Sequence, residues 1–261
     1  MKLFTKDRNL TPSWGLLPKS LRLLRRHITE VMYLNLIPSL ILTLGVILIG
    51  DDSLSQPVSA RESLGILLTI TGLLLTLLVT PGFLLMQTRA VKGKAVHALR
   101  DFKDGLGSIG AMIGYSAILF FGCMVALVFI SIGVFSILAA TGQTTAASST
   151  DARATTLILS IFALTVLVFI RFFALAPFYI VDKNVEPADS LRLSYKETKG
   201  VSRYMWGTVG VLLVFLIPAI AVSMRFPGIG NVLSTFFVLP YTFALALRYG
   251  EIAHKDKNNT V

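Results

Sequence analysis

Six long apolar runs, with basic segments before the first and after the second, fourth and sixth, constrain the fold of this chain more than any other feature. They cover about residues 31–50, 64–87, 108–140, 154–181, 206–224 and 231–248. A helix needs about 20 apolar residues to cross the ~30 Å hydrocarbon layer, whereas barrel strands would be short and alternating. Hydrophobic residues make up 54% of the chain and charged residues only 15%. These features predict an all-α, polytopic membrane protein with six transmembrane helices.

The distribution of Lys and Arg predicts the orientation of these spans. Twenty of the 24 lie in the N-terminal segment, in the loops after the second and fourth runs, and at the C-terminal end. Arg61, Arg153 and Arg225 lie on the opposite side, and Arg171 lies inside the fourth run. Because cytoplasmic loops carry an excess of positive charge, we expect both termini in the cytoplasm of a prokaryotic cell, with the chain in its plasma membrane. This asymmetry explains most of the net charge of +10, so we expect no nucleic-acid partner.

A short basic segment precedes each odd-numbered run. The three segments read PKSLRLLRRHI at 18–28, KAVHALRDFKDGL at 94–106 and PADSLRLSYKETKG at 187–200. Apolar residues follow the spacing of one helical face in the first two and, more weakly, in the third. The faces are Leu17, Leu21, Leu24 and Ile28; Ala95, Leu99, Phe102 and Leu106; and Ala188, Leu191 and Tyr195. Each segment is therefore predicted to form an amphipathic helix at the cytoplasmic interface.

Each even-numbered run carries a proline followed by an aromatic residue near its cytoplasmic end, at Pro81, Pro177 and Pro240. The unit of interfacial helix, span out and span back thus occurs three times, which is typical of membrane folds with internal repeats. The alternative is that any six-span protein with basic loops looks repetitive. The predicted divisions are an N-terminal segment 1–17, a membrane domain 18–250 with repeats 18–90, 91–183 and 184–250, and a tail 251–261.

The stretch RFFALAPFYIVDKNVEPADSLRLSYKETKG carries an arginine, a proline, an acid, then Ser-Leu, Ser and Lys-Gly. These are Arg171, Pro177, Asp182, Ser190-Leu191, Ser194 and Lys199-Gly200. The pattern resembles the glycerophosphodiester phosphodiesterase membrane-domain family and related small bacterial and archaeal membrane proteins. The resemblance implies six spans with interfacial helices. The family's catalytic partner, a soluble barrel with paired acids, has no counterpart in these residues, so the resemblance implies a membrane module without phosphodiesterase activity.

Arg171 is the candidate intramembrane site. It lies eleven residues from Asp182, about 16 Å deeper along a helix, and the other spans hold no acid to pair with it. We expect it to bind carbonyls that prolines free four residues earlier, at Phe173, Leu77 and Phe236. The predicted site comprises Arg171, Pro177, Pro81, Pro240, Asn35 and Tyr115. Two interpretations remain open: an arginine that ties helices together, or an anion site in a cavity open to the cytoplasm.

The basic interfacial helices are the second candidate site, because each Lys or Arg near an anionic leaflet contributes about 1 kcal/mol. The predicted anionic-lipid contacts are Lys19, Arg22, Arg25, Arg26, Arg100, Lys103, Arg192, Lys196 and Lys199. The alternative is that these charges only direct insertion. The sequence shows no nucleophile–base pair and no metal-ligand spacing, so we expect no enzymatic activity, no metal and no cofactor.

The expected function is a non-catalytic membrane module that contacts anionic lipids, or an unidentified membrane or cytoplasmic protein, at the cytoplasmic leaflet. The alternative is a transporter or lipid-handling exporter with a cytoplasm-open cavity centred on Arg171.

The predicted topology can be tested with reporter fusions. A reporter after Val261 is expected in the cytoplasm, and one in the loop 141–153 on the opposite side, because the Lys and Arg excess holds the basic loops inside. Alkaline phosphatase and fluorescent-protein fusions at the two positions measure this. A cytoplasmic loop 141–153 would contradict the count of six spans.

Overall fold

A computed structural model describes residues 10–49, 60–140, 147–225 and 227–255. Within these ranges, the side chains of 138–140, 147–154, 219–220, 223–225, 227–237, 254 and 255 are left out of the description. The described residues form ten helices and no strand. They are α1 (Ser13–Arg26), α2 (Ile28–Ile49), α3 (Ala60–Val91), α4 (Ala98–Leu106), α5 (Ile109–Ala140), α6 (Ala147–Phe173), α7 (Ala176–Lys183), α8 (Pro187–Lys199), α9 (Ser202–Arg225) and α10 (Pro227–Lys255).

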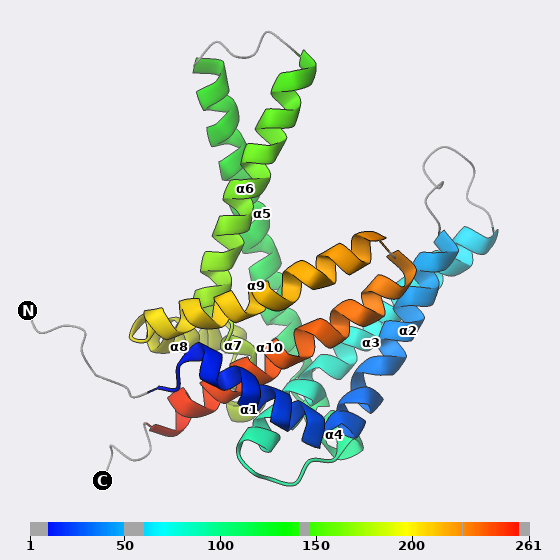
Figure 1. Cartoon of the computed structure of the whole chain (residues 1–261), viewed down its shortest axis with the longest axis vertical. Coiled ribbons are helices and arrows are strands. Elements are labelled where there is room, and N and C mark those ends of the chain that lie inside the picture. The colour runs from blue at the N-terminus through cyan, green and yellow to red at the C-terminus, as the bar shows by residue number, and fades with distance from the viewer. Residues whose placement is uncertain (1–9, 50–59, 141–146, 226, 256–261) are drawn as a thin grey trace, which may run out of the picture.

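The long helices pair into three hairpins, α2–α3, α5–α6 and α9–α10 (Figure 1). The helices α1, α4, α7 and α8 gather at one end of the molecule, where the N- and C-terminal ends of the described chain also lie, and the hairpins extend away from this end. We call this end the base. The helix α8 turns into α9 through an angle of 107° at the break between them. Such a bend suits a helix that lies in the interface before the chain enters the membrane.

Four stretches of the described residues are long and apolar enough to cross a membrane. They are α2, α3, α5 up to Ile137, and the stretch from Thr155 in α6 to Lys183 in α7. A fifth results if α8 and α9 count as one broken span. Helices also cover the fifth and sixth apolar runs. The prediction of an all-helical protein is confirmed, and it has several helices apolar enough for a multi-pass membrane protein. The six transmembrane spans and the three repeats stay predictions.

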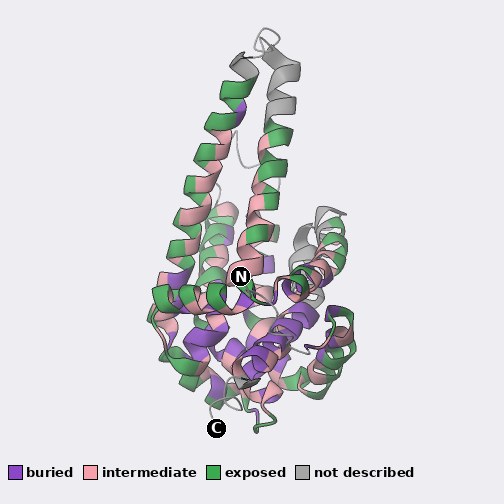
Figure 2. Cartoon of the chain, turned by 90° about the vertical axis from the view of Figure 1, so that its left-hand side faces the viewer, coloured by how far each residue is buried: buried purple, intermediate pink, exposed green. Residues whose placement is uncertain are grey.

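Burial is concentrated at the base, and the hairpins expose apolar side chains (Figure 2). The hairpin α5–α6 shows this most clearly, with Phe121, Phe129 and Leu164 all more than half exposed. Monomeric soluble proteins rarely expose apolar surface over such an extent. The exposed surface of the hairpins is therefore suited to contact with lipid chains.

Two predicted boundaries differ from the structure. The fourth run does not form one helix, because α6 ends at Phe173 and α7 begins at Ala176. The helix α1 begins at Ser13, before Pro18, where the sequence placed its start. Leu10 and Leu16, from the predicted N-terminal segment, are buried. The described part of that segment, residues 10–17, therefore belongs to the packed base, since α1 lies against α9 and α10.

Most of the predicted apolar face of α4 is turned away from the protein, and of its four residues only Phe102 is partly buried. Leu99 is 84% exposed, while Asp101 and Gly105 are buried. A Cβ at Gly82 of α3 would lie 2.6 Å from Cα of Phe102, and one at Gly105 would lie 2.8 Å from the carbonyl carbon of Pro81. Only glycines allow this backbone approach between α3 and α4, as small residues do in membrane helix pairs. The apolar face of α4 is left for lipid or another ligand.

A side chain at Gly105 should separate these two helices. Gly105→Ala places a methyl group against the backbone of Gly82 and Pro81, and we expect a loss of about 1–3 kcal/mol in unfolding free energy. Denaturant unfolding of the full chain in detergent measures this. In the control Gly107→Ala the nearest atom is 3.6 Å away, so stability should be nearly unchanged. Equal stability of the two variants would contradict the close packing.

Candidate functional site at the base

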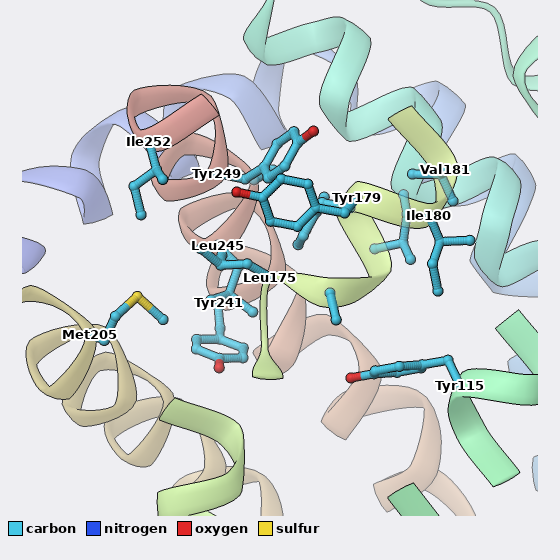
Figure 3. Close-up of a cluster of buried hydrophobic side chains, with 14 of the residues drawn as sticks. Tyr115, Leu175, Tyr179, Ile180, Val181, Met205, Tyr241, Leu245, Tyr249 and Ile252 are labelled. Atoms are coloured by element: carbon cyan, nitrogen blue, oxygen red, sulfur yellow. The ribbon is translucent and has the colours of Figure 1, made fainter. Parts of the chain in front are cut away.

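The helix α7 is the centre of the base. Residues 175, 176 and 178–181 are buried almost completely, and they pack with side chains from α5, α9 and α10 (Figure 3). The ring of Tyr249, from α10, stacks on Phe178 and meets Tyr179 edge to face, with centroids 5.6 and 4.9 Å away. Such aromatic pairs add about 0.5–1.5 kcal/mol beyond area burial. A short helix at the end of a span is thus held in a fixed position.

Hydroxyl groups satisfy the carbonyls at the break between α6 and α7. Pro177 has no N–H to offer Phe173, and the Phe173 carbonyl accepts a hydrogen bond from the hydroxyl of Tyr115 at 3.3 Å. The carbonyl of Phe172 accepts from Ser194 at 2.7 Å and from Thr198 at 3.2 Å. Ser and Thr commonly restore such backbone bonds in membrane helices. The break therefore needs no ligand to be stable.

The contacts that the structure describes for Arg171 include none of the carbonyls that the prolines free. Its guanidinium donates to the hydroxyl of Ser202, the first residue of α9. It also lies 4.4 Å from the ring centroid of Phe172 and 5.3 Å from that of Trp206. At the Phe173 carbonyl the described donor is Tyr115 and not Arg171, whereas the expected contacts with the carbonyls of Leu77 and Phe236 stay predictions. Arginine suits its actual partners because its planar group stacks on aromatic faces.

The other residues of the predicted intramembrane site lie apart from the contacts that the structure describes for Arg171. Asn35 donates to the carbonyl of Val31 in its own helix. Pro81 lies at the contact of α3 with α4, and Pro240 is buried in α10. Of this set, only Tyr115 and Pro177 meet, through the Phe173 carbonyl.

Asp182 forms the polar junction of the base. Its carboxylate pairs with the ammonium of Lys92, which follows α3, and accepts a hydrogen bond of 2.7 Å from the hydroxyl of Tyr249 in α10. Both Asp182 and Lys92 are mostly shielded from solvent. One carboxylate thus joins α3, α7 and α10. The sequence suggested the position of Asp182 near the interface but not these partners.

Arg248 is a second buried cation at the base, and its burial was not foreseen. Its side chain is 0% exposed and pairs with Glu251 at 2.8 Å. Its guanidinium carbon lies 5.3 Å from the ring of Tyr204, and one of its nitrogens is 3.4 Å from the hydroxyl of Ser13. The sequence counted Arg248 among the charges that direct insertion. Its position one turn before a glutamate was the only signal of another role.

Arg89 connects α3 to α4 through two acids. It pairs with Asp101, whose side chain is fully buried, and with the exposed Asp104 at 2.6 Å. Asp101 also accepts a 3.2 Å hydrogen bond from the backbone N–H of His97, so it holds the start of α4. The sequence signal for this contact was the spacing of Asp101 and Asp104, three residues apart on a helix that follows Arg89.

All nine predicted anionic-lipid contacts are exposed. They lie on α1, α4 and α8, whose buried residues are small or polar except for Leu16 of α1. Partial burial lowers the pKa of the neighbouring His27 below 6.5, Glu30 opposes this shift and Arg26 adds to it. His27 therefore contributes little charge at neutral pH. The positive charge of this surface comes from its Lys and Arg residues.

Comparisons with protein-family models, curated proteins and solved structures give no match for this chain.

The junction at Asp182 predicts a large effect of one substitution. Asp182→Asn removes the charge that Lys92 faces, so we expect a loss of about 1–3 kcal/mol in unfolding free energy. Chemical unfolding of the full chain in detergent measures it. Asp104→Asn is the control: this acid is exposed, and its loss should cost less than about 1 kcal/mol. Equal effects of both substitutions would argue against Asp182 as the junction.

Proposed function

We propose that this chain is a non-catalytic, six-span module of the plasma membrane that holds anionic lipids, or through them a partner protein, at the cytoplasmic leaflet. In this proposal each hairpin and its preceding short helix form one of three repeats, and both termini are cytoplasmic. The resemblance to the glycerophosphodiester phosphodiesterase membrane domain is part of the same proposal.

The observation that supports it most is the arrangement of charge on the three short helices. Each buries one face in the base and exposes its basic residues, and all three lie at the same end of the molecule. Charges that serve only insertion need no common fixed support. A set of basic residues on packed helices, in contrast, suits a surface of lipid phosphates, because each such residue contributes about 1 kcal/mol near an anionic leaflet.

Exposed apolar residues on the same helices extend this argument. Trp14 and Leu21 on α1 and Leu99 on α4 are all exposed beside the basic residues. Amphipathic helices that lie in the membrane interface carry this combination of aromatic, aliphatic and basic side chains. The helices therefore have the composition to insert between headgroups while their charges meet phosphates.

The surroundings of Arg171 favour this module over a transporter. Its guanidinium donates to Ser202 and lies beside two aromatic rings of the protein. Its Nε is buried and has no partner among the described residues. The two grooves described below are lined by other residues. A cavity centred on Arg171 would need the contact with Ser202 to open.

Lipid retention tests the proposal. The full chain is purified in mild detergent from vesicles of equal phosphatidylglycerol and phosphatidylcholine, and retained lipid is measured by mass spectrometry. We expect phosphatidylglycerol to dominate, and Arg22→Gln/Arg25→Gln to reduce it about ten-fold or more, since two phosphate contacts are lost.

The matched control is Arg61→Gln, because Arg61 is also exposed but belongs to the opposite side of the predicted membrane. It should leave phosphatidylglycerol retention unchanged. Equal retention of the two lipids by the native chain would show that the basic residues serve insertion alone.

A further inference from the structure

Two neighbouring grooves lie along α2 at the base. The larger, about 630 Å³, is lined by α2, α3 and α4 and the residue before α4. The smaller, about 440 Å³, lies on α2. Their lining residues are Thr29, Glu30, Tyr33, Leu34, Val79, His97, Ala98, Leu99 and Phe102 for the first, and Ile28, Thr29, Met32, Tyr33, Leu36 and Ile37 for the second. Both volumes fall within the ~300–1,000 Å³ typical of small-molecule sites.

The two grooves share Thr29 and Tyr33, so they run on either side of one tyrosine. Tyr33 is 69% exposed. Most of the remaining lining is aliphatic or aromatic. Tyrosine is enriched at the level of lipid headgroups, which places the polar ends of both grooves there. Two apolar grooves that both begin at the level of the lipid headgroups match the two acyl chains of a diacyl lipid.

The charges at the polar end favour an anionic headgroup. Arg26 precedes Thr29 by three residues, and Arg100 directly follows Leu99; both arginines are exposed. Arg100 donates from one nitrogen to the carbonyl of Ala95, and its Nε lies 3.8 Å from the carboxylate of Asp101. Its planar fork still has a further nitrogen to donate from. Glu30 is the acid among the lining residues, and Asp101 and Asp104 are paired with Arg89.

We propose that these two grooves form a site for one anionic phospholipid, with its acyl chains on either side of Tyr33 and its phosphate bound by Arg26 and Arg100. This lipid site rests on the proposed function and gives the binding of anionic lipid a location on the protein. It also explains why Leu99 is exposed on α4 while Asp101 and Gly105 face the protein. The other basic residues of α1 and those of α8 then meet bulk lipid, whereas this site selects its lipid.

Photo-crosslinking tests the site. Benzoylphenylalanine replaces Ile37 in the full chain, which is reconstituted into vesicles of equal phosphatidylglycerol and phosphatidylcholine with matched acyl chains. Intact-mass analysis then separates the two lipid adducts from a dimer of the chain. We expect the phosphatidylglycerol adduct to exceed the phosphatidylcholine adduct at least about five-fold. The matched control replaces Ile132 of α5; both isoleucines are 57% exposed, and Ile132 should give nearly equal adducts.

Variants of the probe-bearing chain then test the headgroup contacts. Arg26→Gln/Arg100→Gln should bring the preference at Ile37 below about two-fold, whereas Arg61→Gln should leave it unchanged. Equal adducts at Ile37 and Ile132, a preference that survives the double substitution, or a dimer as the main product would each overturn the site. Total phosphatidylglycerol retention is measured in the same samples. Normal retention without a preference at Ile37 would defeat this site alone, whereas absent retention would also defeat the proposed function.

Discussion

The carboxylate of Asp182 is the interaction on which the arrangement of the helices depends. It pairs with the ammonium of Lys92 and accepts a hydrogen bond from the hydroxyl of Tyr249. The ends of three hairpins therefore meet at this carboxylate. Apolar helices gain little from burying leucine against each other in a membrane, because lipid chains are equally apolar. Contacts that lipid cannot replace must then hold the helices together. A shielded ion pair with a further hydrogen bond is such a contact, since each partner left alone would be an unpaired charge.

The same constraint explains the other contacts at the base. The glycines at 82 and 105 bring two backbones together, and hydroxyl groups from α5 and α8 satisfy the carbonyls that the break after α6 leaves open. An open carbonyl in hydrocarbon would cost several kcal/mol. Polar pairs, close backbone contact and satisfied carbonyls together give a rigid base. The hairpins beyond the base expose apolar side chains, which lipid chains would cover.

This division places recognition at the base. A rigid end can hold basic side chains in a fixed pattern, which a bundle of separate hairpins could not do. The larger groove beside Tyr33 lies where α4 turns its apolar side outward, and Arg26 and Arg100 are near its lining residues in the sequence. The proposed lipid site therefore follows from the same packing that buries Asp101 and Gly105. Packing and binding use opposite faces of one short helix.

The sequence by itself determined the helices and their class, because a run of about 20 apolar residues has few other stable forms in a membrane. It also identified the short basic helices and the exposed cations, since charged side chains stay outside the core. The tertiary structure decided which contacts the polar groups make. The proline pattern predicted that carbonyls near Pro177 would be open, yet whether Arg171 or Tyr115 reaches them depends on where α5 and α9 lie. The apolar face of α4 is a second example. The sequence periodicity of such a face is identical whether the face contacts protein or lipid, so only the tertiary structure decides between them.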